Sequence, residues 1–194
     1  MSTAWTIATT TELGFPWIEP QNSGQAGTTT QPQAGDCAHI RQQLLGDSRN
    51  RNALNDAWTR SQARTRNVHE VGGLLGQVID EGQLYQKDVR VISPYNPPAN
   101  SPSNRLTGFN SWAQPQIKSD SQTVVYDYWY HTHPFDIGDI HPDTGLRQQV
   151  NPREVSDDDA GISRDLGGLR GVIVTRTAIV VFDPSGHVNC TFRR

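Results

Sequence analysis

The sequence is short of cysteine and has no excess of basic residues, and each shortage excludes a class of protein. Cys37 and Cys190 stand far apart and outside any Cys-x-x-Cys pair, so a cysteine-based zinc site is not expected. Two cysteines do not make a disulfide framework, and the sequence leaves open whether they form one bridge. The formal net charge of -3, without a Lys/Arg cluster, argues against nucleic acid as a partner.

Long apolar runs are also missing. No stretch approaches the roughly 18 residues of a membrane span, so we expect no transmembrane helix. Residues 1–20 lack the basic start and apolar middle of a secretory signal, so any export would use a route without one. Residues 21–35, rich in Gly, Gln and Thr, have almost nothing to bury. We therefore expect a flexible leader over residues 1–35 and one folded domain over residues 36–194.

Hydrophobic periodicity within that domain predicts an α/β (α+β) fold, a single mixed β-sheet flanked by helices. Asp36 has the character of an N-cap for the first helix, and the glycines near residue 72 suggest a strand whose backbone is closely approached. Helices are predicted over 36–45, 51–64 and 156–166, strands over 68–79, 85–92, 123–133, 171–175, 178–183 and 188–192, and long loops over 93–116 and 135–155.

The strand ending at Pro134 carries the residues with the clearest chemistry. Side chains at i and i+2 of a strand share a face, so His131 and His133 should project side by side and can bind one metal ion. Asp127 and Trp129 are predicted on that same face. The strand's tyrosines are predicted on the opposite face: Tyr126, Tyr128 and Tyr130.

A catalytic zinc usually takes three protein ligands, and its water needs a base. Asp159, in the segment Ser156-Asp157-Asp158-Asp159 at a helix start, is the best third ligand, with Ser156 as the cap of that helix. Glu70, which precedes the glycine-bearing strand, is the candidate base. A strand His-x-His pair and a Ser-x-x-acid cap both have ordinary structural explanations, which lowers the specificity of each piece taken alone.

Taken in order, these segments resemble the JAB/MPN (JAMM) metallopeptidase pattern. The pattern consists of a Glu before a Gly-Leu-rich strand, then His-Ser/Thr-His-Pro, then Ser-x-x-Asp, and the match covers roughly residues 68–182. A fainter resemblance links the chain to JAB-like domains of bacterial polymorphic toxins. The resemblance implies the JAB/MPN (cytidine-deaminase-like) architecture, with Zn2+ held by His131, His133 and Asp159. It also implies Glu70 as general base and Ser156 as donor to the oxyanion.

The spacing departs from the family, because Asp159 lies much further beyond the second His than the pattern places it. We attribute this to an insertion over residues 135–155. Other acids and one histidine remain as alternative third ligands: Asp136, Asp139, His141, Asp143, Asp157 and Asp158.

The function implied by the resemblance is hydrolysis of a peptide or isopeptide bond, in a protein or in peptidoglycan, by a zinc-activated water. The toxin likeness implies a bacterial effector made in the cytoplasm, then exported, with an immunity protein as a further partner. Two alternatives are a non-catalytic scaffold that keeps the fold, and hydrolysis of a small amide at the same site.

Overall fold

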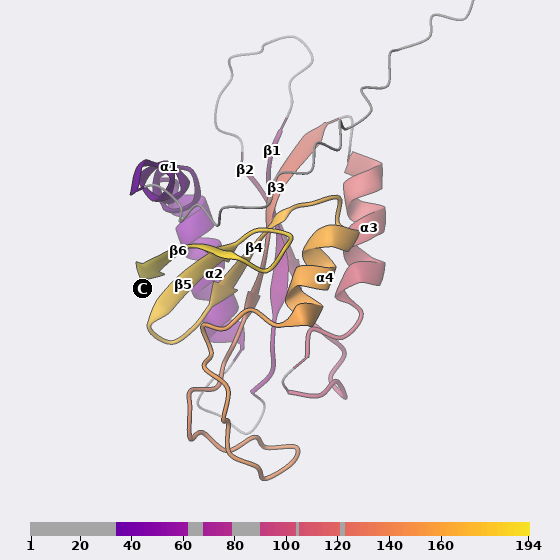
Figure 1. Cartoon of the computed structure of the whole chain (residues 1–194). Helices are drawn as coiled ribbons and strands as arrows, with labels where there is room; N and C mark the ends of the chain where they lie inside the picture. The colour runs from indigo at the N-terminus through magenta and orange to yellow at the C-terminus, as the bar shows by residue number, and fades with distance from the viewer. Residues whose placement is uncertain (1–33, 62–67, 79–89, 104, 121–122) are drawn as a thin grey trace, which may run out of the picture. The chain divides into compact units, whose positions relative to one another are not determined.

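The computed structural model describes residues 34–61, 68–78, 90–103, 105–120 and 123–194. Over these residues, four helices pack on a single six-stranded mixed sheet (Figure 1). The predicted leader lies outside the described residues, apart from residues 34 and 35 at the start of the first helix. The elements are α1 (Ala34–Leu45), α2 (Ser48–Arg60), β1 (Gly72–Val78), β2 (Arg90–Tyr95), α3 (Phe109–Asp120), β3 (Val124–Thr132), α4 (Asp157–Asp165), β4 (Arg170–Val174), β5 (Ala178–Phe182) and β6 (Val188–Arg193).

The sheet has the order β2-β1-β3-β4-β5-β6, which places β3 in its interior. Neighbouring strands are antiparallel except for β3 and β4, which run parallel. A parallel pair needs a crossover connection, and here residues 133–169, with α4, supply it. This crossover brings α4 back against the same sheet, although a long irregular segment separates α4 from β3 in the sequence.

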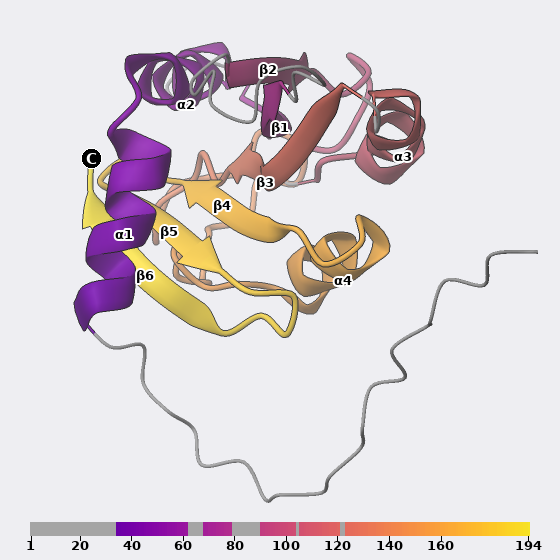
Figure 2. The ribbon, with the colours of Figure 1, turned by 90° about the horizontal axis from the view of Figure 1, so that it is seen from above.

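Two hydrophobic clusters cover the two faces of the sheet. Figure 2 shows α1 and α2 on one side and α3 and α4 on the other. Leu54 of α2 packs with Tyr128 and Tyr130 in the first cluster, and Phe109 of α3 packs with Trp129 in the second. The alternation of neighbouring β3 residues between the two clusters is the period of two expected for a strand buried on both faces.

The expectation that Tyr126 shares a face with the other two tyrosines is wrong. Tyr126 belongs to the cluster of Trp129 and Phe109. The pairing of β1 with β3 shifts at this point, because Leu75 pairs with Tyr128 whereas Gly76 pairs with Tyr126. The extra residue in β3 breaks the period of two, as a β-bulge does, and moves Tyr126 to the other face.

The predicted loop over residues 93–116 is wrong in its second half, where α3 forms. Its composition, with Pro115 inside the helix, disfavours a helix by propensity alone. Burial decides otherwise, because Phe109 and Ala113 are fully buried against the sheet. Tertiary packing supplies most helix stability in proteins, and it outweighs the local signal here.

The other predicted elements agree with the structure except at their ends, and residues 62–64, 79 and 85–89 of these predictions lie outside the described residues. Asp36 lies in the first turn of α1 and is not its cap. The helix α2 begins at Ser48, three residues before the predicted start, because the Asp47 side chain accepts a hydrogen bond from the Arg49 N–H. The predicted close approach to the β1 backbone is confirmed, since a Cβ on Gly73 would lie 2.5 Å from the Tyr130 hydroxyl oxygen. None of the helices described is both long and apolar enough to cross a membrane.

Candidate metal centre

The two histidines of the His131-Thr132-His133-Pro134 segment lie side by side at the end of β3. Their Nε2 atoms are 2.9 Å apart, and the ring centroids are separated by 4.7 Å. His131 is completely buried, whereas His133 is partly exposed. Thr132, between them, ties the strand to its neighbour, because its N–H donates to the Val71 carbonyl and its Oγ1 accepts from the Val71 N–H. The geometry of the pair is therefore fixed by sheet pairing.

Asp159 joins this pair from the first turn of α4. Its Oδ1 atom lies 3.1 Å from His131 Nε2, and its Oδ2 atom lies 3.8 Å from His133 Nε2. Among the described residues, His131, His133 and Asp159 form the group able to hold a metal ion, with ligand atoms all within 4.8 Å of one another. The sequence-predicted ligand set is thus brought together by the fold.

A capping box orients the Asp159 carboxylate. Ser156 caps α4 by accepting a hydrogen bond from the Asp159 N–H at 3.1 Å, as predicted. In return, the Ser156 N–H donates to Asp159 Oδ2 at 2.9 Å. The same carboxylate therefore closes the capping box through Oδ2 and faces His131 through Oδ1.

The tautomer of His133 suits a metal ligand. Its Nδ1 atom lies 2.8 Å from the carbonyl oxygen of Pro152, and a carbonyl can only accept, so Nδ1 must carry the proton. Nε2 then presents its lone pair toward His131 and Asp159. A hydrogen bond from the second ring nitrogen to a carbonyl is the usual way in which a ligand histidine is oriented.

The distances within the group fit a tetrahedral ion. A zinc–nitrogen bond of about 2.0–2.1 Å places two ligand atoms of a tetrahedron about 3.4 Å apart. Here the two Nε2 atoms are 2.9 Å apart, Oδ1 of Asp159 lies 3.1 Å from His131 Nε2, and Oδ2 of Asp159 lies 3.8 Å from His133 Nε2. Each contact is near this spacing, although the last two involve different oxygens of the carboxylate. Two imidazole nitrogens and a carboxylate also match the donors that zinc prefers in catalytic sites. The residues therefore fit a metal ion of this kind.

Burial and mutual charge set the protonation of the three side chains. Burial, reinforced by His131, lowers the pKa of His133 to about 4. Burial opposes ionisation of Asp159, but His131 first, and then His133 and the Ser156 N–H, hold the pKa of this carboxyl far below its usual range. Burial also lowers the pKa of His131, yet Asp159 and Glu70 outweigh it and raise the pKa above 6.5. An ionised carboxylate and a neutral His133 are the forms that bind metals.

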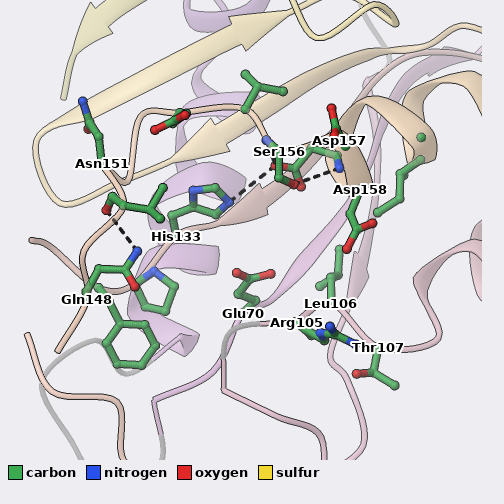
Figure 3. Close-up of a pocket in the computed structure, with 18 of the residues that line it drawn as sticks. Glu70, Arg105, Leu106, Thr107, His133, Gln148, Asn151, Ser156, Asp157 and Asp158 are labelled. Carbon is green, nitrogen blue, oxygen red and sulfur yellow. Dashed lines mark hydrogen bonds and ion pairs between the residues drawn. The ribbon is translucent and has the colours of Figure 1, made fainter. Parts of the chain in front are cut away.

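Glu70 lies beside this group, just before β1. Its N–H donates to the Ser103 carbonyl at 3.1 Å, which fixes the backbone. Figure 3 shows its carboxylate pointing into the cleft on the side where His133 and Ser156 lie. Burial outweighs the opposing charge of His131 and, together with Asp159, raises the pKa of Glu70 to about 8. A carboxyl that titrates near neutral pH can both accept and return a proton.

The cleft has a volume of about 740 Å³ and an acidic lining. Six carboxyl groups border it: Glu70, Glu154, Asp157, Asp158, Asp159 and Asp165. Arg105 is the one Lys or Arg side chain that lines the cleft among the described residues. Gln148 and Asn151 of the irregular segment 135–155 line the wall opposite Arg105 and Asp158 (Figure 3), so this segment helps to shape the cleft.

The alternative third ligands lie outside the metal group. Asp136 and Asp139 both pair with Arg176, at 2.6 and 3.0 Å. Asp143 accepts hydrogen bonds from the N–H and hydroxyl of Ser103, and His141 contacts Gln148. Asp157 and Asp158 are exposed on the cleft wall (Figure 3).

Two contributors to the site could not be found from the sequence. The Pro152 carbonyl that orients His133 is a backbone group, and no residue pattern marks it. The ring of Trp129 stacks on His131, with centroids 4.8 Å apart and planes at 7°. The period of two predicts that Trp129 shares a face of the strand with His131, but it does not predict that the two rings stack.

Comparison with known proteins identifies no relative of the chain among family models or curated proteins. The geometry of the site and the resemblance of its motifs are therefore what support a function for this chain.

Proposed function

We propose that this chain is a zinc-dependent peptidase or isopeptidase of the JAMM type, with the corresponding JAB/MPN architecture. One observation carries the proposal. His131 and His133 of the β3 segment and Asp159 from α4 converge beside a cleft that His133, Asp159 and Glu70 line. An ordinary capping box or a solvated histidine pair requires no such convergence of three metal-ligating side chains with a carboxyl of raised pKa.

His131, His133 and Asp159 would hold the ion at the edge of the cleft that His133 and Asp159 line. When bound, zinc supplies Lewis-acid activation of water and of the scissile carbonyl. Glu70 then accepts a proton from the attacking water as the oxygen–carbon bond forms. As the carbon–nitrogen bond breaks, Glu70 returns that proton to the leaving amine, so the carboxylate is restored. The remaining hydrogen of the water leaves with the carboxylic acid product, which ionises in solution.

Ser156 is placed to assist at the carbonyl oxygen. Its Oγ accepts from the Asp159 N–H, which leaves the hydroxyl hydrogen free to turn toward the cleft that Ser156 lines. A donor aimed at the developing negative charge is worth roughly 2.7–4 kcal/mol in comparable sites. Ser156 thus has two compatible roles, as helix cap and as donor.

The test compares the zinc-loaded protein with Glu70→Gln, which keeps size and polarity but cannot take the proton. Each is incubated with a proteome-derived peptide pool and with lysine-branched peptides, and new termini are identified by mass spectrometry. We expect equal zinc content and a loss of cleavage of about 10²–10⁴-fold in the variant. Unchanged cleavage in Glu70→Gln would overturn the assignment. Bound zinc without any cleavage would favour a scaffold.

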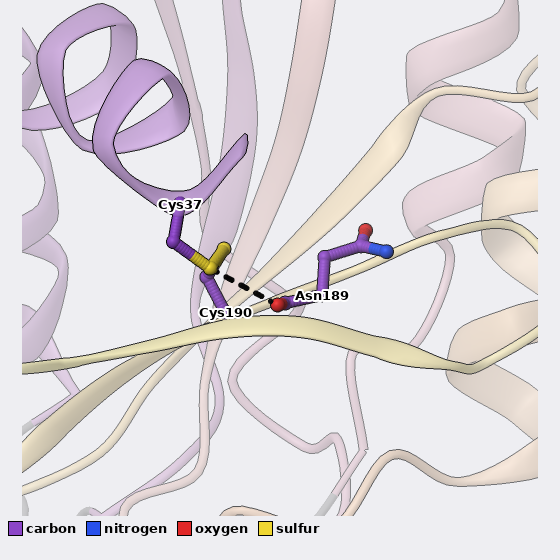
Figure 4. The surroundings of a disulfide bond; sticks show 3 residues. All are labelled: Cys37, Asn189 and Cys190. Carbon is purple, nitrogen blue, oxygen red and sulfur yellow. Dashed lines mark hydrogen bonds between the residues drawn. A yellow bond between two sulfur atoms is a disulfide. The ribbon is translucent and has the colours of Figure 1, made fainter. Parts of the chain in front are cut away.

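A disulfide supports the part of the proposal that concerns export. Cys37 of α1 is bonded to Cys190 of β6, and Cys37 Sγ also lies 3.2 Å from the Asn189 carbonyl oxygen (Figure 4). Disulfides persist mainly in oxidising compartments. We therefore propose that the protein acts outside the reducing cytoplasm. The further proposal that it is a bacterial effector with an immunity protein rests on the resemblance to toxin domains alone. Growth that is unaffected by its expression in both the cytoplasm and the periplasm would argue against the effector role.

A further inference from the structure

His131 lacks the kind of contact that orients His133. Its Nδ1 atom is buried and has no hydrogen-bond partner within the described part of the chain. Ligand histidines are normally held by a hydrogen bond from the second ring nitrogen, as the Pro152 carbonyl does for His133. Another group must therefore fix the orientation of the His131 ring.

That group is Trp129, two residues earlier on the same face of β3. Its ring lies against His131 in a near-parallel stack, with centroids 4.8 Å apart and planes at 7°. Both side chains are essentially inaccessible to solvent. Phe109 and Phe182 pack against other parts of the Trp129 ring, which leaves it little freedom to tilt. Stacking on a fixed ring sets the plane of the imidazole.

Trp129 also contacts the element that carries the third ligand. Its indole N–H donates to Ser163 Oγ at 2.7 Å. Ser163 is buried and lies one turn after Asp159 on α4, so this hydrogen bond sets the position of the helix relative to β3. A buried indole N–H requires an acceptor, because without one it loses its hydrogen bond to water and gains none in return.

We propose that Trp129 is the positioning residue of this metal centre: its ring orients His131, and its N–H places Asp159 through Ser163. This inference rests on the proposed zinc function and adds to it. A residue that only fills the core affects the stability of the fold but not the affinity of the folded protein for zinc. Zinc affinity therefore distinguishes the two roles.

The first test measures the zinc dissociation constant by competition with a chromophoric chelator, and the absorption spectrum of the Co2+-substituted protein. Trp129→Leu removes the stack, and we expect zinc affinity to fall about 10–100-fold, with altered cobalt bands. Tyr128→Leu is the matched control, because Tyr128 is equally buried on the opposite face of the same strand. It should destabilise the fold while leaving the zinc affinity unchanged.

The second test separates the hydrogen bond from the stack. Trp129→Phe keeps an aromatic ring on His131 but cannot donate to Ser163, and Ser163→Ala removes the acceptor. Each should weaken zinc binding less than Trp129→Leu does. Their effects should not add in the double variant, since both remove the same contact. If Trp129→Leu does not fold, these two variants still test whether Trp129 positions the metal ligands.

Folded Trp129 and Ser163 variants with wild-type zinc affinity and wild-type cobalt spectra would overturn the role of Trp129 while leaving the zinc site standing. An equal loss of affinity in Tyr128→Leu would overturn it as well. A wild-type protein that binds no zinc would contradict both this role and the proposed function, so the two failures are distinguishable.

Discussion

The Nε2 atom of His131 lies 3.1 Å from Oδ1 of Asp159, and this contact joins the end of β3 to the first turn of α4. The other oxygen of the same carboxylate accepts the Ser156 N–H and closes the capping box. One side chain therefore serves both the helix terminus and the candidate metal centre. The two roles can be separated experimentally, because Ser156 takes part in the capping box but is not one of the metal ligands.

Asp159→Ala should abolish tight zinc binding and also destabilise the protein, whereas Ser156→Ala should destabilise it and slow cleavage while leaving zinc binding intact. Loss of the capping contact should lower the free energy of unfolding by about 1 kcal/mol in each variant. Only the aspartate supplies a ligand. Chelator competition measures the zinc affinity, and urea unfolding measures the free energy of unfolding. The account would be wrong if Ser156→Ala lost zinc as completely as Asp159→Ala.

Zinc affinity should fall as the pH decreases through the pKa of His131, which is raised above 6.5. Below that pKa, a proton occupies the imidazole nitrogen that the metal needs, so protons and zinc compete. His133, with a pKa of about 4, and Asp159, with a lowered pKa, remain deprotonated over this range. Titration with zinc at pH 8, 7, 6 and 5 should show a progressive loss of affinity as the pH falls. Affinity independent of pH would contradict the involvement of His131.

Removing the disulfide should lower the free energy of unfolding by up to roughly 5 kcal/mol, because it closes a loop with a sequence separation of 153. The double variant Cys37→Ser/Cys190→Ser and the wild type in reductant should unfold at the same lower urea concentration. Cys190 belongs to the cluster on the face opposite Trp129, so zinc affinity of the folded variant should not change. Identical urea midpoints with and without the bridge would contradict this prediction.

The acidic cleft should favour a positively charged side chain beside the metal. N-acetyl-lysine hydroxamate and N-acetyl-norleucine hydroxamate offer the same zinc-binding group and differ mainly by one amine. We expect the lysine compound to bind the zinc-loaded protein several-fold more tightly in low salt, and calorimetry measures the difference. Glu154→Gln/Asp165→Asn removes two charges from the cleft wall and should reduce the preference. Equal binding of both compounds to the wild type would show that the cleft charge does not select the ligand.

The parts of the site that follow a local period could be predicted from the sequence. The period of two placed His131 beside His133, and the Ser-x-x-acid spacing placed Asp159 in the first turn of α4. The mixed sheet flanked by helices followed from the same kind of pattern. Each of these depends on residues only a few positions apart.

The parts that depend on distant contacts could not be predicted. α3 forms because Phe109 and Ala113 are buried against the sheet, which no local propensity encodes. The bulge that moves Tyr126 arises from pairing with β1, and the bridge between Cys37 and Cys190 depends on α1 reaching β6. The third ligand stayed open among several acids because only the crossover from β3 to β4 selects Asp159.

A crystal structure of the zinc-loaded protein, with anomalous diffraction recorded at the zinc edge, tests the central claim most directly. We predict one zinc ion per chain, bound by Nε2 of His131, Nε2 of His133 and a carboxylate oxygen of Asp159 at about 2.0–2.2 Å, with a position open toward Glu70. An anomalous peak elsewhere, or no peak after saturation with zinc, would contradict the account.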